Sequence, residues 1–220
     1  MWKLIKKILI FLVITLIILL SILTISGYSI YKNAVKEISL EDKIESLEKD
    51  ENYTYYNELP ENYINAVVAI EDHRFKTHNG LDFIALGRAM LRNIQEFNFV
   101  EGGSTITQQV AKNLYFTQDK KITRKVAELF VAFNLEKNYN KEKILELYVN
   151  TNYFGSGYYG IKEAAQGYFD KNPNELNLEE CALLAGIPNA PSVYSLNANP
   201  DLAHERAEQV MNAMREHGYI

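Results

Sequence analysis

The sequence has one cysteine, Cys181, one tryptophan, and no charged residue between Ile8 and Tyr31. A single thiol excludes an internal disulfide and a zinc site built on several thiolates. Because Cys181 lies in an apolar run, we expect a buried small side chain rather than a nucleophile. Basic residues are outnumbered, 23 to 28, and the net charge of −5 argues against nucleic acid as a general partner, since that class of protein usually presents a basic face.

Internal repeats and low-complexity segments are also absent from the 220 residues. Apolar residues make up 47% of the chain and charged residues 23%, which is the composition of a folded protein, and the length fits one domain. The charges are unevenly divided. Residues 1–36 carry five lysines and no acid, residues 37–51 carry seven acids and two lysines, and the remainder is again acidic. We therefore expect three segments in different surroundings.

The first segment predicts a membrane anchor at residues 8–28. This run is apolar apart from a few hydroxyl-bearing residues and one glycine, and about 20 apolar residues cross the hydrocarbon core of a bilayer. A cleaved signal peptide is the alternative, but its apolar region is shorter and ends at a small-x-small cleavage site, which is missing here. Because three lysines precede the run, the positive-inside rule places residues 1–7 in the cytoplasm and the chain after the anchor outside it.

Residues 29–54 are expected to form an acidic stalk, either a solvated helix or a loose connection, because apolar positions are sparse there. Residues 55–220 then form the main domain. Strand signals are weak in it, so the predicted fold class is mainly α. The predicted helices begin at Pro60 and then cover residues 83–94, 105–115, 122–137, 141–149, 178–187 and 203–215.

Two glutamates stand out because each adjoins a strongly apolar helix surface. Glu71 ends a run of aliphatic residues, and Glu128 interrupts another. A carboxylate in such surroundings is desolvated and its pKa rises, which general acid–base chemistry at neutral pH requires. The alternative is a structural ion pair at a helix edge. Arg124 and Glu128 are four residues apart and could simply pair.

A cationic run follows from Lys112 to Lys125, with five basic residues against one aspartate. Fixed cations near the start of an apolar helix suit a phosphate or pyrophosphate group. The segment from Gly102 to Thr105 precedes a helix and offers free backbone N–H groups for an anion. The alternative is a solvated lysine face. Together with the glutamates and the anchor, the run predicts chemistry on an anionic, lipid-linked substrate.

Two further features leave alternatives open. His73 and His78 could suggest a metal site, but their spacing suits two ligands on one helix face poorly, and hydrogen bonds that hold the turn after Glu71 are the favoured interpretation. Several aromatic residues share a glycine-rich region. They could stack on sugar rings, although the protein core is the more usual place for such side chains. The residues are Tyr153, Phe154, Tyr158, Tyr159, Tyr168 and Phe169.

Five ordered segments resemble the motifs of the peptidoglycan glycosyltransferases, which are the monofunctional transglycosylases and the glycosyltransferase domains of class A penicillin-binding proteins. The resemblance covers about residues 58–215. It implies a lysozyme-like, mainly α glycosyltransferase domain with a small membrane-proximal lobe, and an inverting reaction that polymerises lipid II. The segments are Glu71–Gly80, Gly102–Gln109, Arg124–Glu128, Lys143–Asn150 and Ala182–Ser192.

The resemblance also implies roles for single residues. Glu71 resembles the general base that takes the proton from the acceptor 4-hydroxyl, and Glu128 resembles a second essential glutamate on the donor side. Asp72, Phe75 and His78 resemble the support of the first motif. The residues similar to those that hold the donor sugar and pyrophosphate are Ser104, Gln109, Lys112, Asn113, Arg124 and Lys125.

The implied partners are lipid II, the nascent glycan strand, the bacterial cytoplasmic membrane and other cell-wall synthesis proteins. No cofactor is expected, although Mg²⁺ or Mn²⁺ stimulates some relatives. The sequence departs from the family at Asp170, where glycine is frequent, and after Arg206, where the second arginine of a pair is lost. No transpeptidase domain is expected, as in the monofunctional type or in a shortened bifunctional one.

A lysozyme-like enzyme that cleaves glycan and an inactive scaffold remain the alternative functions. The first does not need the cationic run, and the presence of both glutamates argues against the second. The loop at residues 97–100, with its apolar side chains, is expected to touch the bilayer, because a solvent-facing loop would otherwise expose apolar area without reason.

Overall fold

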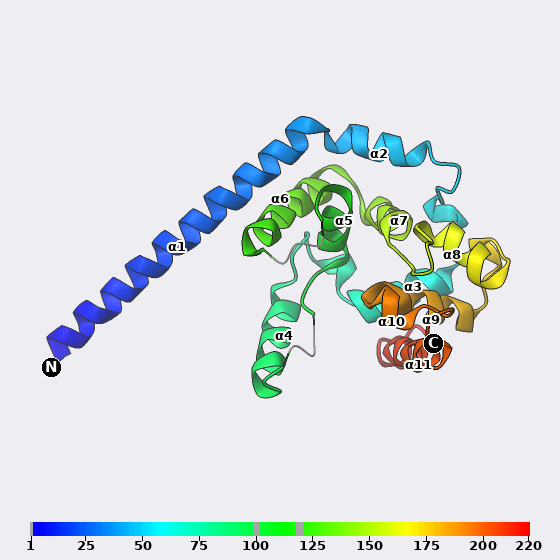
Figure 1. The fold of residues 1–220 in the computed structure, drawn as a ribbon. Helices are drawn as coiled ribbons and strands as arrows, with labels where there is room; N and C mark the ends of the chain where they lie inside the picture. Colours follow the sequence, from blue (N-terminus) through cyan, green and yellow to red (C-terminus); the bar gives the residue numbers. More distant parts are fainter. Residues whose placement is uncertain (1, 99–101, 118–120) are drawn as a thin grey trace.

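The computed structural model describes residues 2–98, 102–117 and 121–220, and this part of the chain is mainly helical. It contains no β-strand, only an isolated bridge between Tyr153 and Tyr159. The predicted mainly α fold class is therefore confirmed (Figure 1). The α-helices are α1 (Trp2–Glu37), α2 (Leu40–Glu48), α3 (Glu61–Glu71), α4 (Phe83–Gln95), α5 (Ile106–Tyr115), α6 (Ile122–Asn138), α7 (Lys141–Thr151), α8 (Gly160–Phe169), α9 (Leu178–Gly186), α10 (Pro191–Tyr194) and α11 (Pro200–Glu216).

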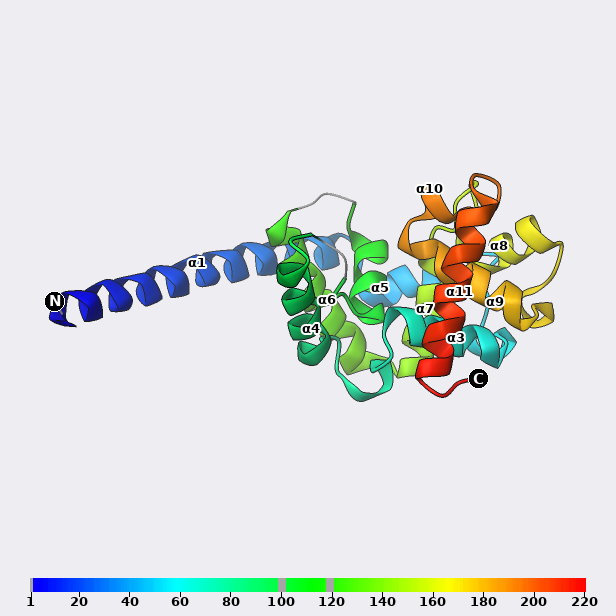
Figure 2. The ribbon, with the colours of Figure 1, turned by 90° about the horizontal axis from the view of Figure 1, so that it is seen from below.

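Helix α1 extends away from the rest of the molecule in both views (Figures 1 and 2). It is 36 residues long, it is apolar enough to cross a membrane, and no residue of its most apolar stretch is buried. Its C-terminal part packs on α6, where a Cβ atom at Gly27 would lie 2.5 Å from Cγ1 of Val126. The ring of Tyr31 stacks on that of Phe130 with centroids 5.8 Å apart. Helix α1 is thus continuous from the apolar segment to its contact with the domain.

The predicted stalk differs from what the structure contains. Residues up to Glu37 continue α1, and α2 then packs against the domain with Leu40 and Ile44 buried in the main core. These two residues lie four positions apart, so they share one helix face and can be buried together. Lys143 of α7 forms an ion pair with Glu48 at the end of α2. The acidic residues of α2 therefore form the outer face of an integrated helix.

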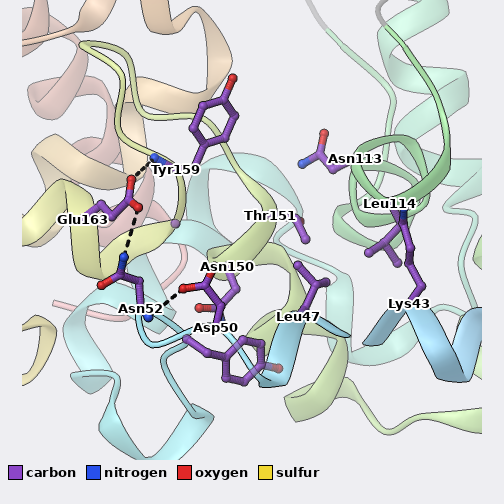
Figure 3. A pocket seen from close by; sticks show the side chains of 12 residues that line it. Lys43, Leu47, Asp50, Asn52, Asn113, Leu114, Asn150, Thr151, Tyr159 and Glu163 are labelled. Carbon is purple, nitrogen blue, oxygen red and sulfur yellow. Dashed lines mark hydrogen bonds between the residues drawn. The ribbon is translucent and has the colours of Figure 1, made fainter. Parts of the chain in front are cut away.

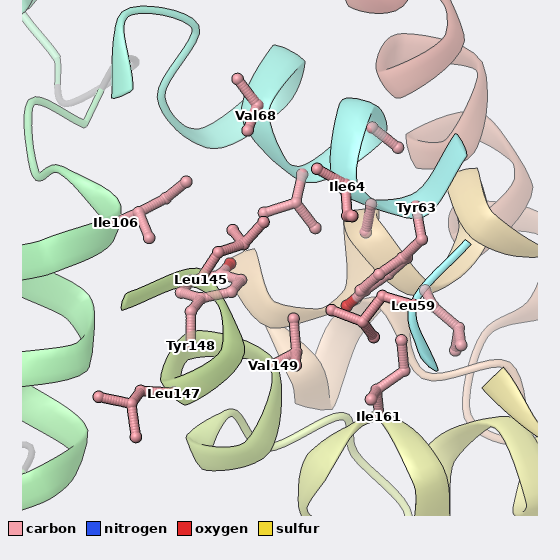
Figure 4. Packing of buried hydrophobic residues seen from close by; sticks show 14 of the residues in the cluster. Leu59, Tyr63, Ile64, Val68, Ile106, Leu145, Leu147, Tyr148, Val149 and Ile161 are labelled. Atoms are coloured by element: carbon pink, nitrogen blue, oxygen red, sulfur yellow. The ribbon is translucent and has the colours of Figure 1, made fainter. Parts of the chain in front are cut away.

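The buried core takes side chains from α3, α5, α7 and α9; α3 packs on α9, α5 packs on α7, and α11 packs on α3 and α9. Tyr63 and Tyr148 are fully buried in this core, beside the aliphatic side chains of α3 and α7 (Figure 4). Helix α8 was not predicted. It follows a glycine-rich turn, begins at Gly160 with φ +76°, and ends at Asp170 in the left-handed conformation. This conformation explains why a glycine suits position 170.

Local signals explain the other helix boundaries. Asp82 accepts hydrogen bonds from the N–H groups of Ile84 and Ala85, and Asn140 accepts one from that of Lys143. Thr105 and Gln108 form the predicted capping box at the start of α5. In each case a side-chain oxygen satisfies a backbone N–H that has no partner inside the helix. These helix starts agree with the predictions to within one residue.

Candidate active site

A cleft of about 790 Å³ lies between α4 and α5 on one side and α10 and α11 on the other. It brings together five of the residues that the resemblance assigns to catalysis or substrate binding. These are Glu71, Ser104, Gln109, Lys112 and Lys125.

Glu71 is the last residue of α3 and borders the cleft with a partly exposed side chain. Its carboxylate accepts a hydrogen bond from Nε2 of Gln109 at 2.6 Å. Burial raises the pKa of Glu71, while this hydrogen bond and the charges of Arg206 and Lys112 work in the opposite direction. The group is thus an oriented carboxylate with a raised pKa at the edge of the cleft. Such a group can accept a proton from a bound hydroxyl.

The turn after Glu71 is held by a buried hydrogen-bond network. Nε2 of His78 lies 2.9 Å from the carboxylate of Asp72, which also accepts a hydrogen bond from the N–H of Ile106 at 3.1 Å. Phe75 is buried in the core below this turn. The network joins the end of α3 to the start of α5 and so sets Glu71 opposite Gln109. His78 thus has the predicted kind of hydrogen-bonding role.

The cationic side of the cleft is formed by Lys112 and Lys125. Nζ of Lys125 donates to Oγ of Ser104 at 2.9 Å, which ties α6 to the segment before α5. Burial and the neighbouring cations lower the pKa of Lys125 to about 8, and burial and Arg124 lower that of Lys112. Two partly desolvated ammonium groups that repel each other are stabilised by an anion between them. A phosphate-bearing group that enters the cleft is therefore expected to raise both pKa values.

Glu128 was predicted to act on the donor side, but the structure does not place it in the cleft. Its side chain is fully buried, forms an ion pair with Arg124, and lies 2.9 Å from Nζ of Lys125. The physical reason is the orientation of α6, which turns Glu128 and Val131 into the domain. The ion pair that the sequence left open is the observed arrangement, and it holds Arg124 and Lys125 from behind.

Asn113 was grouped with the donor-binding residues, but it lines a separate cavity of about 350 Å³. It lies one helical turn beyond Gln109 on α5. Its Nδ2 donates to Oδ1 of Asn152 at 2.8 Å, which connects α5 to the end of α7. Asn113 and Glu71 therefore belong to different hollows of the surface.

Several residues of the cleft were not predicted as parts of it. Arg88 and Arg92 lie four positions apart on α4, and Arg206 projects from α11. The regular spacing of the first two was the only sequence signal for them. The altered arginine pair had pointed to the region of Arg206, but not to its position beside Glu71.

The C-terminal end of α11 also reaches the turn after Glu71. His217 stacks on His73 with ring centroids 4.5 Å apart and an interplanar angle of 5°. His73 therefore holds this turn by ring stacking, and its ring forms no hydrogen bond of the predicted kind within the described residues. Burial and the proximity of His217 lower the pKa of His73. Cys181 is buried, and burial raises the pKa of its thiol to about 12, which agrees with the prediction that it is no nucleophile.

Comparison with known proteins places the chain in a family. Residues 39–215 match the family described as transglycosylase. The chain is 48% identical over 164 residues to penicillin-binding protein 1F of Bacillus subtilis, and 46% identical over 168 residues to penicillin-binding protein 1A of Aquifex aeolicus. These alignments cover 74% and 76% of this chain but only 23% of each relative.

A shorter relative matches over most of its own length. A Cupriavidus necator protein provisionally named a transglycosylase is 42% identical over 179 residues, which are 81% of this chain and 77% of that protein. The resemblance inferred from the five motifs is thus confirmed, together with the lysozyme-like fold class. The chain belongs to the transglycosylase family.

Proposed function

We propose that this protein polymerises lipid II into glycan strands of peptidoglycan. The observation that carries the proposal is the position of Glu71, a carboxylate with a raised pKa, in one cleft with the ammonium groups of Lys112 and Lys125. A base suits the acceptor hydroxyl, and the cations suit the pyrophosphate of the donor. The family and the names of its relatives support the same class of reaction.

The proposed reaction is a single displacement. Glu71 accepts the proton of the acceptor 4-hydroxyl while the oxygen attacks the anomeric carbon of the growing strand. The bond to the undecaprenyl pyrophosphate breaks, and the released negative charge is stabilised by Lys112 and Lys125. Attack opposite the leaving group inverts the anomeric configuration and needs no covalent enzyme intermediate. Glu128 acts in this scheme as a positioning residue, because it holds Arg124 and Lys125 and does not line the cleft.

Incubation of the full chain with lipid II and analysis of the products on a gel tests the proposal. Growth of glycan strands from lipid II supports the proposal. A parallel incubation with pre-formed glycan tests the alternatives: shortening of this glycan favours a cleaving enzyme, and no change in lipid II or in the glycan favours an inactive scaffold. Repeating the assay with and without Mg²⁺ or Mn²⁺ tests the expectation that no metal is required.

Replacement of Lys112 by alanine should weaken the binding of a phosphoglycolipid donor mimic by about tenfold or more, because a charge-assisted contact to phosphate is lost. It should also move the acidic limb of the pH–rate profile. Glu71 is active when deprotonated, and Lys112 lowers the pKa of Glu71. Without this cation the pKa rises further, so activity should disappear at a higher pH than in the original protein.

The matched control is Lys137→Ala, because Lys137 is exposed at the end of α6 and does not line the cleft. It should change neither the affinity for the donor mimic nor the pH profile. Unchanged affinity in Lys112→Ala would mean that the cationic run is only a solvated face.

The lipid substrate also requires the cleft to lie near a membrane. We propose that α1 spans the bilayer with its N-terminus in the cytoplasm and that α4 touches the outer surface. Helix α4 exposes Phe83, Met90 and Leu91, each by more than 60% of its surface, and Phe97 just beyond it is 96% exposed. Phe99 and Val100, which belong to the loop predicted to touch the bilayer, lie outside the described residues. Contact with lipid would remove this apolar surface from water.

A tryptophan at position 97 should report this contact. In a protein with Trp2 replaced by Phe, Phe97→Trp should be strongly quenched by brominated lipids in vesicles. Tyr55→Trp is the control, because Tyr55 is exposed in the segment between α2 and α3, away in sequence from α4, and its fluorescence should change little. Equal and weak quenching at both positions would contradict the membrane contact of the segment after α4.

A further inference from the structure

Two exposed tyrosines lie beside a glycine-rich turn that the catalytic cleft does not include. Tyr153 and Tyr159 pair across this turn with ring centroids 4.8 Å apart, and Tyr159 is 62% exposed. Phe154 between them is fully buried. Gly155 and Gly157 have φ values of +78° and +91°, which few other residues adopt without strain. The turn thus directs one aromatic residue into the core and the paired rings toward solvent.

Tyr159 also lines the cavity of about 350 Å³ that contains Asn113. Lys43 of α2 and Asn52 contribute to the same lining, and the residues come from four separate parts of the chain (Figure 3). A second cavity of about 430 Å³ shares Asn52 and Glu163 with the first. We call the two adjoining cavities the distal groove.

The distal groove contains polar groups with unused hydrogen-bonding capacity. Within the described residues, the Lys43 ammonium has no hydrogen-bond or ion-pair partner, although its side chain is half-buried. Asn113 uses its Nδ2 on Asn152, so its Oδ1 remains available. Asn52 donates from Nδ2 to Glu163 at 3.1 Å, and the N–H of Tyr159 donates to the same carboxylate at 2.8 Å. Glu163 thereby orients both the amide and the tyrosine.

This combination fits a carbohydrate that carries carboxylate groups. An exposed aromatic face accommodates the apolar face of a sugar ring, and side-chain amides can both donate to and accept from hydroxyl and acetamido groups. Lys43 supplies a charge for a carboxylate. A lipid chain would leave the ammonium, amide and carboxylate groups of this lining without hydrogen-bond partners.

The distal groove begins close to the catalytic cleft. Gln109 contacts Glu71, and Asn113 lies four residues further along α5, which is about 6 Å along the helix axis. A strand whose end lies at Glu71 can therefore reach the groove with sugars a short distance from the reacting centre.

We propose that the distal groove binds the glycan strand at sugars remote from the reacting end and retains the strand between successive additions. The identity of this ligand rests on the proposed function. A second contact on the same strand raises the effective concentration of its end at the cleft. This second contact should increase the number of additions that occur before the strand is released, and it should leave the rate of the first transfer unchanged.

Tyr159→Ala and Lys43→Ala test the proposal, with Tyr55→Ala and Lys49→Ala as matched controls. Tyr55 is exposed but does not line the groove, and Lys49 lies at the end of the same helix as Lys43. The full chain in detergent is titrated with a soluble, N-acetylated oligosaccharide that carries lactyl carboxylates. The rate of the first transfer and the length of the products are then measured with lipid II.

Tyr159→Ala should weaken oligosaccharide binding about three- to tenfold, as the loss of one aromatic contact predicts. It should shorten the products while the first transfer stays within about twofold, and Lys43→Ala should also weaken binding of this carboxylate-bearing oligosaccharide. The controls should behave like the original protein. Unchanged binding and product length in both groove variants would overturn the proposal.

The same titration separates the two proposals. If the original protein makes no polymer but binds the oligosaccharide in a Tyr159-dependent way, the proposed reaction fails and the groove stands. If it polymerises lipid II and the groove variants match it in both measurements, only the groove proposal fails.

Discussion

Replacement of Glu71 by glutamine should reduce the rate of lipid II polymerisation by at least about 10²- to 10⁴-fold, the usual contribution of a general base. Glutamine keeps the size of the side chain, and its oxygen can still accept the hydrogen bond from Gln109, but it cannot take a proton from the acceptor hydroxyl. Initial rates on lipid II measure the effect. Donor binding should stay near its original value, because Lys112 and Lys125 are untouched.

The same variant should fold at least as stably as the original protein. Burial raises the pKa of Glu71, which means that the folded state favours the neutral form of this side chain. Stability is therefore lost as the group ionises, and a neutral glutamine avoids this loss at neutral pH. Glu61→Gln, at the exposed start of the same helix, is the control and should retain full activity. More than a tenth of the original turnover in Glu71→Gln would reject Glu71 as the base.

Replacement of Glu128 by alanine, unlike replacement of Glu71 by glutamine, should cause a large loss of stability. The fully buried carboxylate compensates Arg124 and Lys125, and removal of one partner from a buried pair leaves charge without compensation. The expected loss is about 3–5 kcal/mol in the free energy of unfolding, measured by denaturant or thermal unfolding. Activity should fall as well, because Lys125 would lose its position in the cleft.

A double-variant cycle separates this loss from a simple packing defect. Arg124→Ala combined with Glu128→Ala should recover part of the stability, because the pair is then removed as a unit. A melting temperature of Glu128→Ala equal to that of the original protein would show that the buried ion pair does not stabilise the domain. Glu71 and Glu128 would thus be distinguished as a reacting group and a positioning group.

The sequence was sufficient for those features that depend on neighbouring residues. The long uncharged run predicts α1, because whether a helix is long and apolar enough to span a bilayer depends only on its own length and composition. Asp82, Thr105 and Asn140 predict helix starts, because a cap acts within three residues of its own position. Helix α8 was missed because its start, Gly160, depends on a positive φ in a turn that no periodic pattern announces.

The composition of the cleft was decided only by the tertiary structure. Arg88, Arg206 and His217 line the same cleft as Glu71 but come from parts of the chain that are far apart, and helical spacing relates only residues on one helix. The same limit applies to Glu128 and Asn113. The sequence shows on which face of its own helix each residue lies. Only the packing of α6 and α5 against their neighbours determines whether that face meets the cleft, the core or the distal groove.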